Sequence, residues 1–236
     1  MIELNHLVTG YRGRALSQPL SGRFAPGSLT AIMGANGAGK STLLKTLAGL
    51  LPAVSGTVRY GQRKPQIAWL PQQSDIDHHF PLRVSDVVAM GSWPSTGMLR
   101  GMGRAMRDRI DNALAQVGLT PLAGRAISQL SGGQFQRMLF ARMLVQDAQV
   151  LLLDEPFTGI DSQTSTLLLQ VIDALHRKGK TIITVLHSQP VVERHFPQLL
   201  FLHEGHYHWG STARVLAGGH ARLTPAILCT TTQAPR

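Results

Sequence analysis

A glycine-rich run between an apolar run and an amphipathic segment constrains the fold of this chain more than any other feature. Residues 29–33 are apolar except for Thr30, residues 34–41 read Gly-Ala-Asn-Gly-Ala-Gly-Lys-Ser, and leucines recur at helical spacing over residues 41–51. This order predicts a buried strand, a tight loop and a helix that Pro52 ends. The opening of the chain is therefore typical of an α/β domain.

The glycine-rich run, called the phosphate loop below, fits the pattern G-x-x-x-x-G-K-[ST]. In this pattern successive backbone N–H groups and a helix N-terminus bind phosphate oxygens. Lys40 is expected to reach the β and γ phosphates of a nucleotide, and the Ser41 hydroxyl is expected to bind Mg²⁺. The expected nucleotide-binding residues of the loop are Gly34, Ala35, Asn36, Gly37, Ala38, Gly39, Lys40, Ser41 and Thr42.

The composition fits one packed domain with an anionic partner. Of the 236 residues, 43% are hydrophobic and 15% are charged, which suits one large domain with or without a small lobe. The formal net charge of +10 favours a nucleotide, a nucleic acid or an anionic lipid surface. Cys229 is the one cysteine and the N-terminus has no signal-peptide pattern, so a reducing compartment is expected. Apolar runs are shorter than the roughly 18 to 20 residues of a spanning helix, so any spanning part is expected in another chain.

The rest of the chain alternates short strands and helices, which predicts a mainly parallel sheet covered on both faces. Period-two apolar stretches over residues 1–30 predict strands in the N-terminal part. Apolar residues at helical spacing over residues 106–117, followed by Gly118, predict the clearest helix of a mostly helical lobe. The other expected elements are a strand at 150–153, a helix at 164–176, a strand at 181–186, a hairpin turning at 204–205 and a short helix near Ala213.

Two adjacent carboxylates, Asp154 and Glu155, follow the apolar residues 150–153. Ligands bind at the carboxyl ends of strands in open α/β sheets. Two acids are costly to bury there unless a cation or a proton transfer uses them. We expect Asp154 to coordinate Mg²⁺ through water and Glu155 to polarise an attacking water. The alternative is that the two acids cap the following turn.

Residues 130–134 read Leu-Ser-Gly-Gly-Gln and open a predicted helix with Ser131 as its N-cap. The start of this helix offers backbone amides and a hydroxyl to an anion, but the loop holds no lysine. A second phosphate site of this kind is hard to explain if the chain acts alone. It is explained if the loop serves the nucleotide of a neighbouring copy.

With its motifs in this order, the chain resembles the nucleotide-binding subunit of an ABC transporter over roughly residues 1–218. The phosphate loop matches Walker A, residues 130–134 match the LSGGQ signature, and residues 154–155 end Walker B. The resemblance implies an α/β fold: a P-loop NTPase core with a mainly parallel sheet, an N-terminal antiparallel β part and a helical lobe that carries the signature. It also implies a head-to-tail dimer that holds two ATP molecules, each between Walker A of one protomer and the signature of the other. The signature residues facing the partner's ATP would be Ser131, Gly132, Gly133 and Gln134.

The same resemblance assigns roles to single residues. Tyr11 would stack on adenine, Gln72 would sense Mg²⁺ and the attacking water, and Glu155 would be the catalytic base. His187 would contact the γ-phosphate, and Asp161 would link the two sites of the dimer. Mg²⁺ would be held through Ser41, Gln72 and Asp154. Three alternatives stay open, namely Tyr11 as a surface aromatic, His187 as a helix-entry residue and Gln73 in place of Gln72.

The resemblance further implies one ABC-type ATPase domain over residues 1–229, with a helical lobe at about 83–145 inserted in the αβ core and a loose tail at 230–236. The expected partners are a second copy of the chain, a transmembrane permease subunit and, for an importer, an extracytoplasmic solute-binding protein. The expected location is the cytoplasmic face of the cell membrane, held peripherally. Nucleic acid is not expected, because the basic residues are not interleaved with aromatics.

The segment at residues 80–91 reads F-P-x-x-V-x-D-V-V-x-M-G and resembles the ATPases of zinc and manganese importers. ATP hydrolysis that powers uptake of a divalent metal ion is therefore the leading hypothesis. The alternatives are an importer ATPase for iron chelates or another substrate, and a soluble ABC ATPase outside transport.

Two groups of residues have plain interpretations. The histidines at 78–79 and at 203, 206 and 208 are expected to be solvated or packed rather than metal ligands. The arginines over residues 100–109 are expected to form a solvated helix face or to contact the membrane subunit or lipid headgroups.

Overall fold

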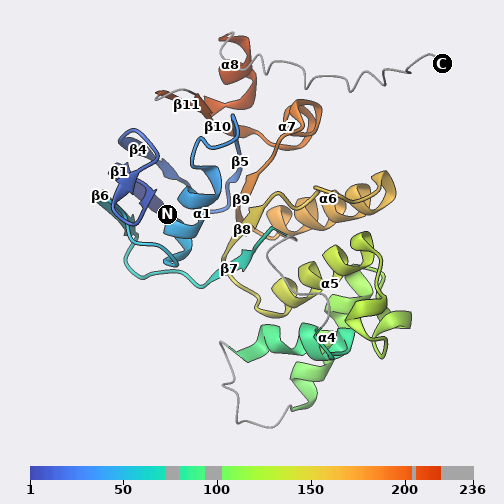
Figure 1. The fold of residues 1–236 in the computed structure, drawn as a ribbon. Helices are drawn as coiled ribbons and strands as arrows, with labels where there is room; N and C mark the ends of the chain where they lie inside the picture. Colours follow the sequence, from blue (N-terminus) through green and yellow to red (C-terminus); the bar gives the residue numbers. More distant parts are fainter. Residues whose placement is uncertain (73–79, 94–102, 204–205, 219–236) are drawn as a thin grey trace, which may run out of the picture.

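The protein folds around a six-stranded sheet with the strand order β11-β10-β5-β9-β8-β7 (Figure 1). The computed structural model describes residues 1–72, 80–93, 103–203 and 206–218. In this sheet every neighbouring pair is parallel except β10 and β11. The six strands are β5 (Leu29–Gly34), β7 (Ile67–Leu70), β8 (Val150–Asp154), β9 (Thr181–Val185), β10 (Gln198–His203) and β11 (His206–Ser211).

A smaller antiparallel sheet is built from the N-terminal part of the chain, with the order β4-β1-β6. Its strands, and those of a short two-stranded ribbon, are β1 (Ile2–Val8), β2 (Gly10–Tyr11), β3 (Arg14–Ala15), β4 (Leu20–Phe24) and β6 (Ser55–Tyr60). The α-helices are α1 (Lys40–Ala48), α2 (Val84–Ala89), α4 (Arg104–Gln116), α5 (Gly132–Val145), α6 (Ser162–Arg177), α7 (Gln189–His195) and α8 (Thr212–Ala217).

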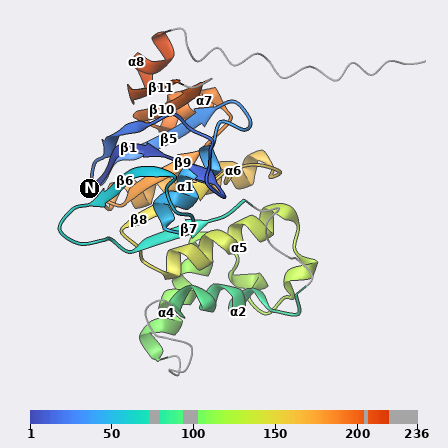
Figure 2. The same cartoon turned by 60° about the vertical axis from the view of Figure 1, so that its left-hand side comes forward.

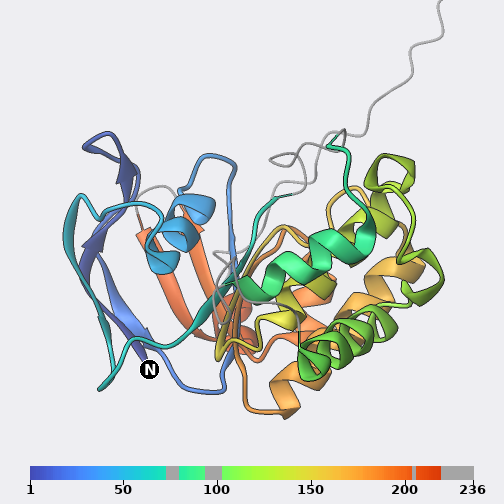
Figure 3. The same ribbon diagram turned by 90° about the horizontal axis from the view of Figure 1, so that it is seen from below.

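Side-chain alternation along the central strands sorts the core into two layers. All residues of β5 and β8 are buried, as expected for strands covered on both faces. Met33 and Leu151 join the cluster that contains the side chains of α2, α4, α5 and α6. Ile32 and Leu152 join the cluster on the other face, with α1 and β1. Figure 3 shows this arrangement, with the antiparallel sheet and α1 on one side of the central strands and the remaining helices on the other.

The helical lobe is formed by α2, α4 and α5, and α5 packs against both of the others and against α6. Figures 1 and 2 show the lobe at the opposite end of the molecule from α8. The same buried cluster runs from the lobe into the central sheet, through Phe135 and Met138 of α5 to Leu153 of β8. The fold therefore confirms the predicted P-loop NTPase core with a mainly parallel sheet, an N-terminal antiparallel part and a helical lobe that carries residues 130–134.

The predicted helices at 106–117 and 164–176 correspond to α4 and α6. Gly118 and Gly179 follow them in left-handed conformations, with φ of +65° and +79°, as glycine C-caps do. The predicted hairpin is formed by β10 and β11, and α8 covers the expected short helix. Its turn at 204–205, Cys229 and the tail at 230–236 lie outside the described residues.

The first helix is shorter than the sequence predicts. It ends at Ala48, before Pro52 is reached. Gly49 adopts φ +81°, and its N–H donates to the carbonyls of Lys45 and Thr46. A left-handed glycine thus satisfies the last carbonyls of the helix and turns the chain away ahead of the proline.

Candidate functional site

The phosphate loop connects the end of β5 to the start of α1, as its motif requires. Gly37 and Gly39 have φ values of +82° and +85°, a region that glycine enters without the penalty of a Cβ. Position 34 requires glycine for a different reason, because a Cβ there would lie 2.3 Å from the carbonyl oxygen of Leu202. The loop therefore combines left-handed turns with a close approach to the neighbouring strand β10.

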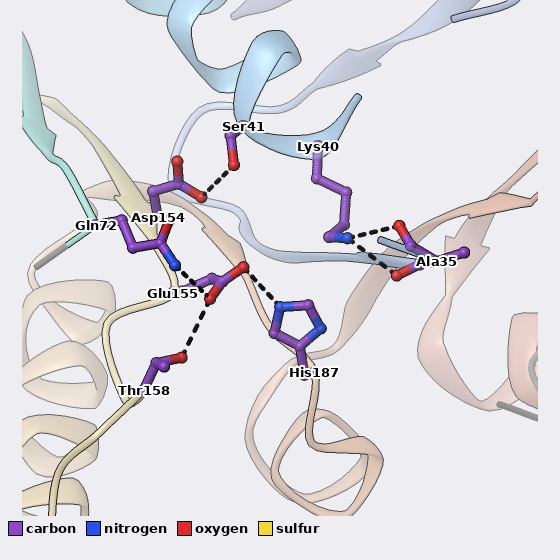
Figure 4. Close-up of polar contacts among 9 residues, drawn as sticks. Ala35, Lys40, Ser41, Gln72, Asp154, Glu155, Thr158 and His187 are labelled. Carbon is purple, nitrogen blue, oxygen red and sulfur yellow. Dashed lines mark hydrogen bonds and ion pairs between the residues drawn. The ribbon is translucent and has the colours of Figure 1, made fainter. Parts of the chain in front are cut away.

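The loop lysine is buried and folds over its own loop (Figure 4). Only 6% of Lys40 is exposed, and its Nζ donates to the carbonyl oxygens of Gly34 at 3.0 Å and Ala35 at 2.8 Å. Burial lowers the pKa of Lys40, and the carboxylates of Glu155 and Asp154 act in the opposite direction. An anion bound by the loop would therefore compete with the two carbonyl oxygens for the Lys40 ammonium group.

An open pocket of ≈ 730 Å³ lies in front of the loop. It is lined by both expected nucleotide-binding and expected catalytic residues, and also by Leu16 and Thr158. The lining residues are Leu16, Asn36, Gly37, Gly39, Lys40, Ser41, Thr42, Gln72, Glu155, Thr158 and His187. The fold therefore gathers five separate segments of the sequence around one cavity.

Glu155 is the centre of the polar contacts in this pocket (Figure 4). The Gln72 amide nitrogen donates to Glu155 Oε2 at 3.0 Å, and the Thr158 hydroxyl donates to the same oxygen at 3.2 Å. His187 Nε2 lies 2.7 Å from Glu155 Oε1. Glu155 itself has φ +49°, an uncommon conformation for a residue other than glycine. Both carboxylate oxygens are thus held in place from neighbouring segments.

Asp154 and Ser41 lie side by side at the start of α1. The Ser41 hydroxyl donates to Asp154 Oδ1 at 3.0 Å, and Asp154 is 2% exposed. A hydroxyl and a carboxylate are the oxygen donors that Mg²⁺ takes beside the phosphates of a nucleotide. The donor set therefore fits the expected Mg²⁺, with Ser41 and Asp154 as the residues that would hold it. Gln72, the third expected ligand, uses its amide nitrogen for Glu155.

Comparison with known proteins decides the family, because residues 17–158 match the sequence model of the ABC transporter family. The chain belongs to the ABC transporter family. The ATP-binding protein TroB of a zinc transport system, from Treponema pallidum, is 39% identical over 206 residues, which cover 85% of this chain and 77% of TroB. The ATP-binding protein MntB of a manganese transport system, from Bacillus subtilis, is 37% identical over 219 residues, covering 91% and 88% of the two chains.

A solved ABC structure agrees with these relatives. It is part of the transporter complex cbiONQ from Clostridium perfringens, with a TM-score of 0.79, 26% sequence identity and coverage of 93% of this chain and 91% of that chain. The comparisons confirm that the chain is an ABC ATPase and that it resembles the subunits of zinc and manganese systems. None of the described helices is both long and apolar enough to cross a bilayer.

The ABC signature forms the start of α5. The Ser131 hydroxyl accepts from the Gln134 N–H at 3.3 Å, and the Gln134 side chain accepts from the Ser131 N–H at 3.1 Å. This reciprocal capping box confirms Ser131 as the N-cap. Ser131 and Gly132 are exposed, Gly133 is buried, and none of the signature residues lines the pocket of its own chain.

Two residues expected around the ATP of an ABC subunit make other contacts here. Tyr11 is 55% exposed and does not line the pocket, and the Arg12 guanidinium lies over its ring at 5.5 Å from the centroid. Asp161 caps α6, because its carboxylate accepts from the Thr164 N–H and from the Thr164 hydroxyl, each at 2.8 Å. These bonds lower the pKa of Asp161.

The described residues of the histidine and arginine groups do not line the pocket in front of the phosphate loop, although His203 and His206 line a smaller pocket that shares Leu16, Asn36 and Gly37 with it. His206 and His208 share a face of β11, and His203 lies opposite His206. Within the described ranges, no group of three or more His, Cys, Asp or Glu could hold a metal ion. Arg104 and Arg107 of α4 are exposed, whereas Arg109 donates to the carbonyl of Val145 at 2.7 Å. The residues at 73, 78–79 and 100 lie outside the described part of the chain.

Sequence reasoning missed two residues of the pocket. Thr158 follows Glu155 by three residues, and the turn between them brings its hydroxyl back to the carboxylate. The three-residue spacing between Glu155 and Thr158 is the sequence signal that could have identified Thr158. Leu16 lines the pocket from the segment after β3, and nothing in its sequence context marked it.

Proposed function

We propose that this chain hydrolyses ATP in a head-to-tail dimer and powers the uptake of a divalent metal ion, zinc or manganese, through a separate membrane permease. The observation that carries the ATPase part is the placement of Glu155 across the pocket from the phosphate loop, with Gln72 and His187 on its two oxygens. The metal part is supported by the relatives TroB and MntB, which belong to zinc and manganese systems.

The chemistry follows from the charges around the pocket. The phosphate loop amides and Lys40 would bind the β and γ phosphates, and Lys40 would exchange two neutral carbonyl partners for a phosphate anion. Glu155 would polarise a water for attack on the γ-phosphorus, so that ADP and inorganic phosphate form. His187 is close enough to Glu155 to reach the same phosphoryl group as charge develops on it.

Gln72 and Mg²⁺ complete this proposal. Gln72 would orient the attacking water together with Glu155, since its amide already lies at that carboxylate. Ser41 and Asp154 would hold Mg²⁺, with Gln72 as a further ligand. When bound, the ion supplies positive charge beside the phosphate oxygens.

A second copy of the chain accounts for the position of the signature. Ser131, Gly132, Gly133 and Gln134 are absent from the pocket of their own chain. The exposed start of α5 presents a hydroxyl and helix amides to the outside, as an anion-binding helix N-terminus does. In a head-to-tail dimer this end would close the ATP site of the partner, with Asp161 between the two sites and Tyr11 beside adenine.

The remaining assignments follow from the family. The domain would span residues 1–229, with the helical lobe at about 83–145 and a tail at 230–236. Its partners would be the permease and a solute-binding protein, and it would sit peripherally on the cytoplasmic face of the membrane. One relative favours a second substrate class, because YfeB from Yersinia pestis, 36% identical over 191 residues, is named for chelated iron transport.

Growth under metal limitation tests the substrate. Cells that carry Lys40→Ala in place of the native chain would grow poorly with a zinc or manganese chelator and recover on addition of that metal. Recovery with an iron chelate alone would support the YfeB-like alternative. Unchanged growth and unchanged metal content would contradict the metal-importer proposal while leaving the ATPase assignment intact.

A further inference from the structure

Gln136 is a buried polar side chain of α5 that the ATP site described above does not use. It is 1% exposed, and its Nε2 donates to the carbonyl oxygen of Pro156 at 3.0 Å. Pro156 directly follows Glu155. The side chain therefore reaches out of the helical lobe and binds the backbone next to the expected catalytic base.

The backbone of Glu155 has a left-handed conformation, with φ +49°, which is unfavourable for a residue with a side chain. Pro156 has no N–H, so its carbonyl is the one hydrogen-bonding group that its backbone offers. The bond from Gln136 fixes the orientation of this carbonyl, and with it the Pro156–Phe157 peptide, one peptide beyond Glu155.

A second contact ties the same helix to the same segment. Gly133 lies one turn before Gln136, so both residues lie on one face of α5. A Cβ at Gly133 would lie 2.9 Å from Thr164 Oγ1 and 3.0 Å from Asp161 Oδ2. The helix that begins with the signature is therefore in close contact with residues 155–164 of its own chain at two successive turns.

We propose that Gln136 is a positioning residue for Glu155, and that its bond to Pro156 transmits movement of the signature helix α5 to the catalytic base of the same chain. This inference deepens the proposed function and rests on it. When the start of α5 engages a nucleotide held by the partner, the rigid helix carries Gln136 with it, and the Pro156 carbonyl and Glu155 follow. Hydrolysis in one site would in this way depend on occupation of the other.

The alternative is that Gln136 only fills the interface between α5 and the loop. Two substitutions separate the roles. Gln136→Met keeps a long unbranched side chain and removes the bond to Pro156. Gln136→Glu keeps the shape, but it can donate to the Pro156 carbonyl only when its acid is protonated. A matched control is Arg109→Met, which removes a side-chain bond from the lobe to the carbonyl of Val145 at the far end of α5.

The experiment measures ATP turnover and melting temperature of the full chain with MgATP, for the wild type and the three variants. Gln136→Met is expected to lower kcat about ten-fold and to change KM less than about two-fold, because binding groups stay in place while the base is misplaced. Gln136→Glu is expected to approach wild-type turnover as the pH falls from about 8.5 to about 6, since burial raises the pKa of the introduced acid. Arg109→Met is expected to keep wild-type kcat.

Wild-type kcat in a folded Gln136→Met would overturn the positioning role and leave the ATPase proposal standing. An equal loss of kcat in Arg109→Met would overturn it too, because any loosening of α5 would then suffice. If Gln136→Met does not fold, Gln136→Glu provides the test. A ratio of its kcat to the wild-type kcat that does not change with pH would overturn the positioning role. Absence of turnover in the wild type would overturn both proposals.

Discussion

His187 Nε2 lies 2.7 Å from Glu155 Oε1, although 31 residues separate the two in the chain. The parallel register explains this contact, because Asp154 at the end of β8 pairs with Val185 of β9. Glu155 and His187 therefore leave the same edge of the sheet from adjacent strands. The phosphate loop leaves that edge from β5, which pairs with β9 on its other side. The phosphate loop, the histidine and the carboxylates thus follow three strands that are adjacent in the sheet, β5, β9 and β8, and all of them lie at one pocket.

A mixing experiment tests the head-to-tail dimer. Lys40→Ala removes the phosphate lysine, and Ser131→Arg blocks the signature, so each variant alone is expected to be inactive. A mixed dimer contains one site with an intact phosphate loop and an intact signature. An equal mixture should therefore recover between about a fortieth and a quarter of wild-type ATP turnover, since half of the dimers are mixed, each has one working site of two, and that site lacks the coupling from an occupied second site.

The control for that experiment replaces Ser131→Arg with a chain that carries both substitutions. No mixed dimer then contains a complete site, and no turnover should return. Failure of the first mixture to recover any activity would contradict the assignment of each signature to the partner's nucleotide.

Two glycines of the phosphate loop should differ in their cost of substitution. In Gly37→Ala the added Cβ has no atom within 4 Å. The substitution therefore costs only the strain of the left-handed φ, roughly 1–2 kcal/mol of unfolding free energy. Gly34→Ala adds a clash with the Leu202 carbonyl oxygen, for about 1–3 kcal/mol more. Urea unfolding of both variants measures the difference, and equal stability of the two would contradict the close approach of β5 and β10.

Asp161 gives a pH-dependent contribution to stability. Hydrogen bonds from the Thr164 N–H and hydroxyl hold its pKa below the ordinary value of 3.8. A carboxyl whose pKa is lower in the folded state than in the unfolded state stabilises the fold at any pH above its unfolded-state pKa. This contribution is lost as the pH falls through the folded-state pKa. The melting temperature of the wild type should therefore exceed that of Asp161→Asn by a margin that is constant at higher pH and shrinks below about pH 4. A margin that does not change with pH would contradict the charge-assisted cap.

Much of the site is predictable because local motifs determine it. The phosphate loop needs only its own glycines and the flanking strand and helix, and the Ser131 cap needs only residues 131–134. Glu155 and His187 are found because each follows an apolar run that forms a strand of the parallel sheet. Their expected roles in hydrolysis stay predictions.

The rest depends on distant or competing interactions. The end of α1 is mispredicted because Gly49 caps the helix before Pro52 acts. Thr158 reaches Glu155 through a turn, and its three-residue spacing is the one signal in the sequence. Gln136 reaches Pro156 through the packing of the lobe, which leaves no pattern in the sequence. Tyr11 carries a role only through family resemblance, and its contact with Arg12 follows from local chain geometry.

The most direct test of the account is the ATP turnover of Glu155→Gln. The amide keeps the shape of the side chain but cannot act as a base, so the variant should bind MgATP, dimerise and lose turnover by about 100-fold or more. Turnover at saturating MgATP, measured beside nucleotide binding and dimer formation, gives the answer. Loss of hydrolysis with retained ATP-dependent dimerisation is the predicted result, and wild-type turnover in a folded Glu155→Gln would contradict the assignment of Glu155 as the catalytic base.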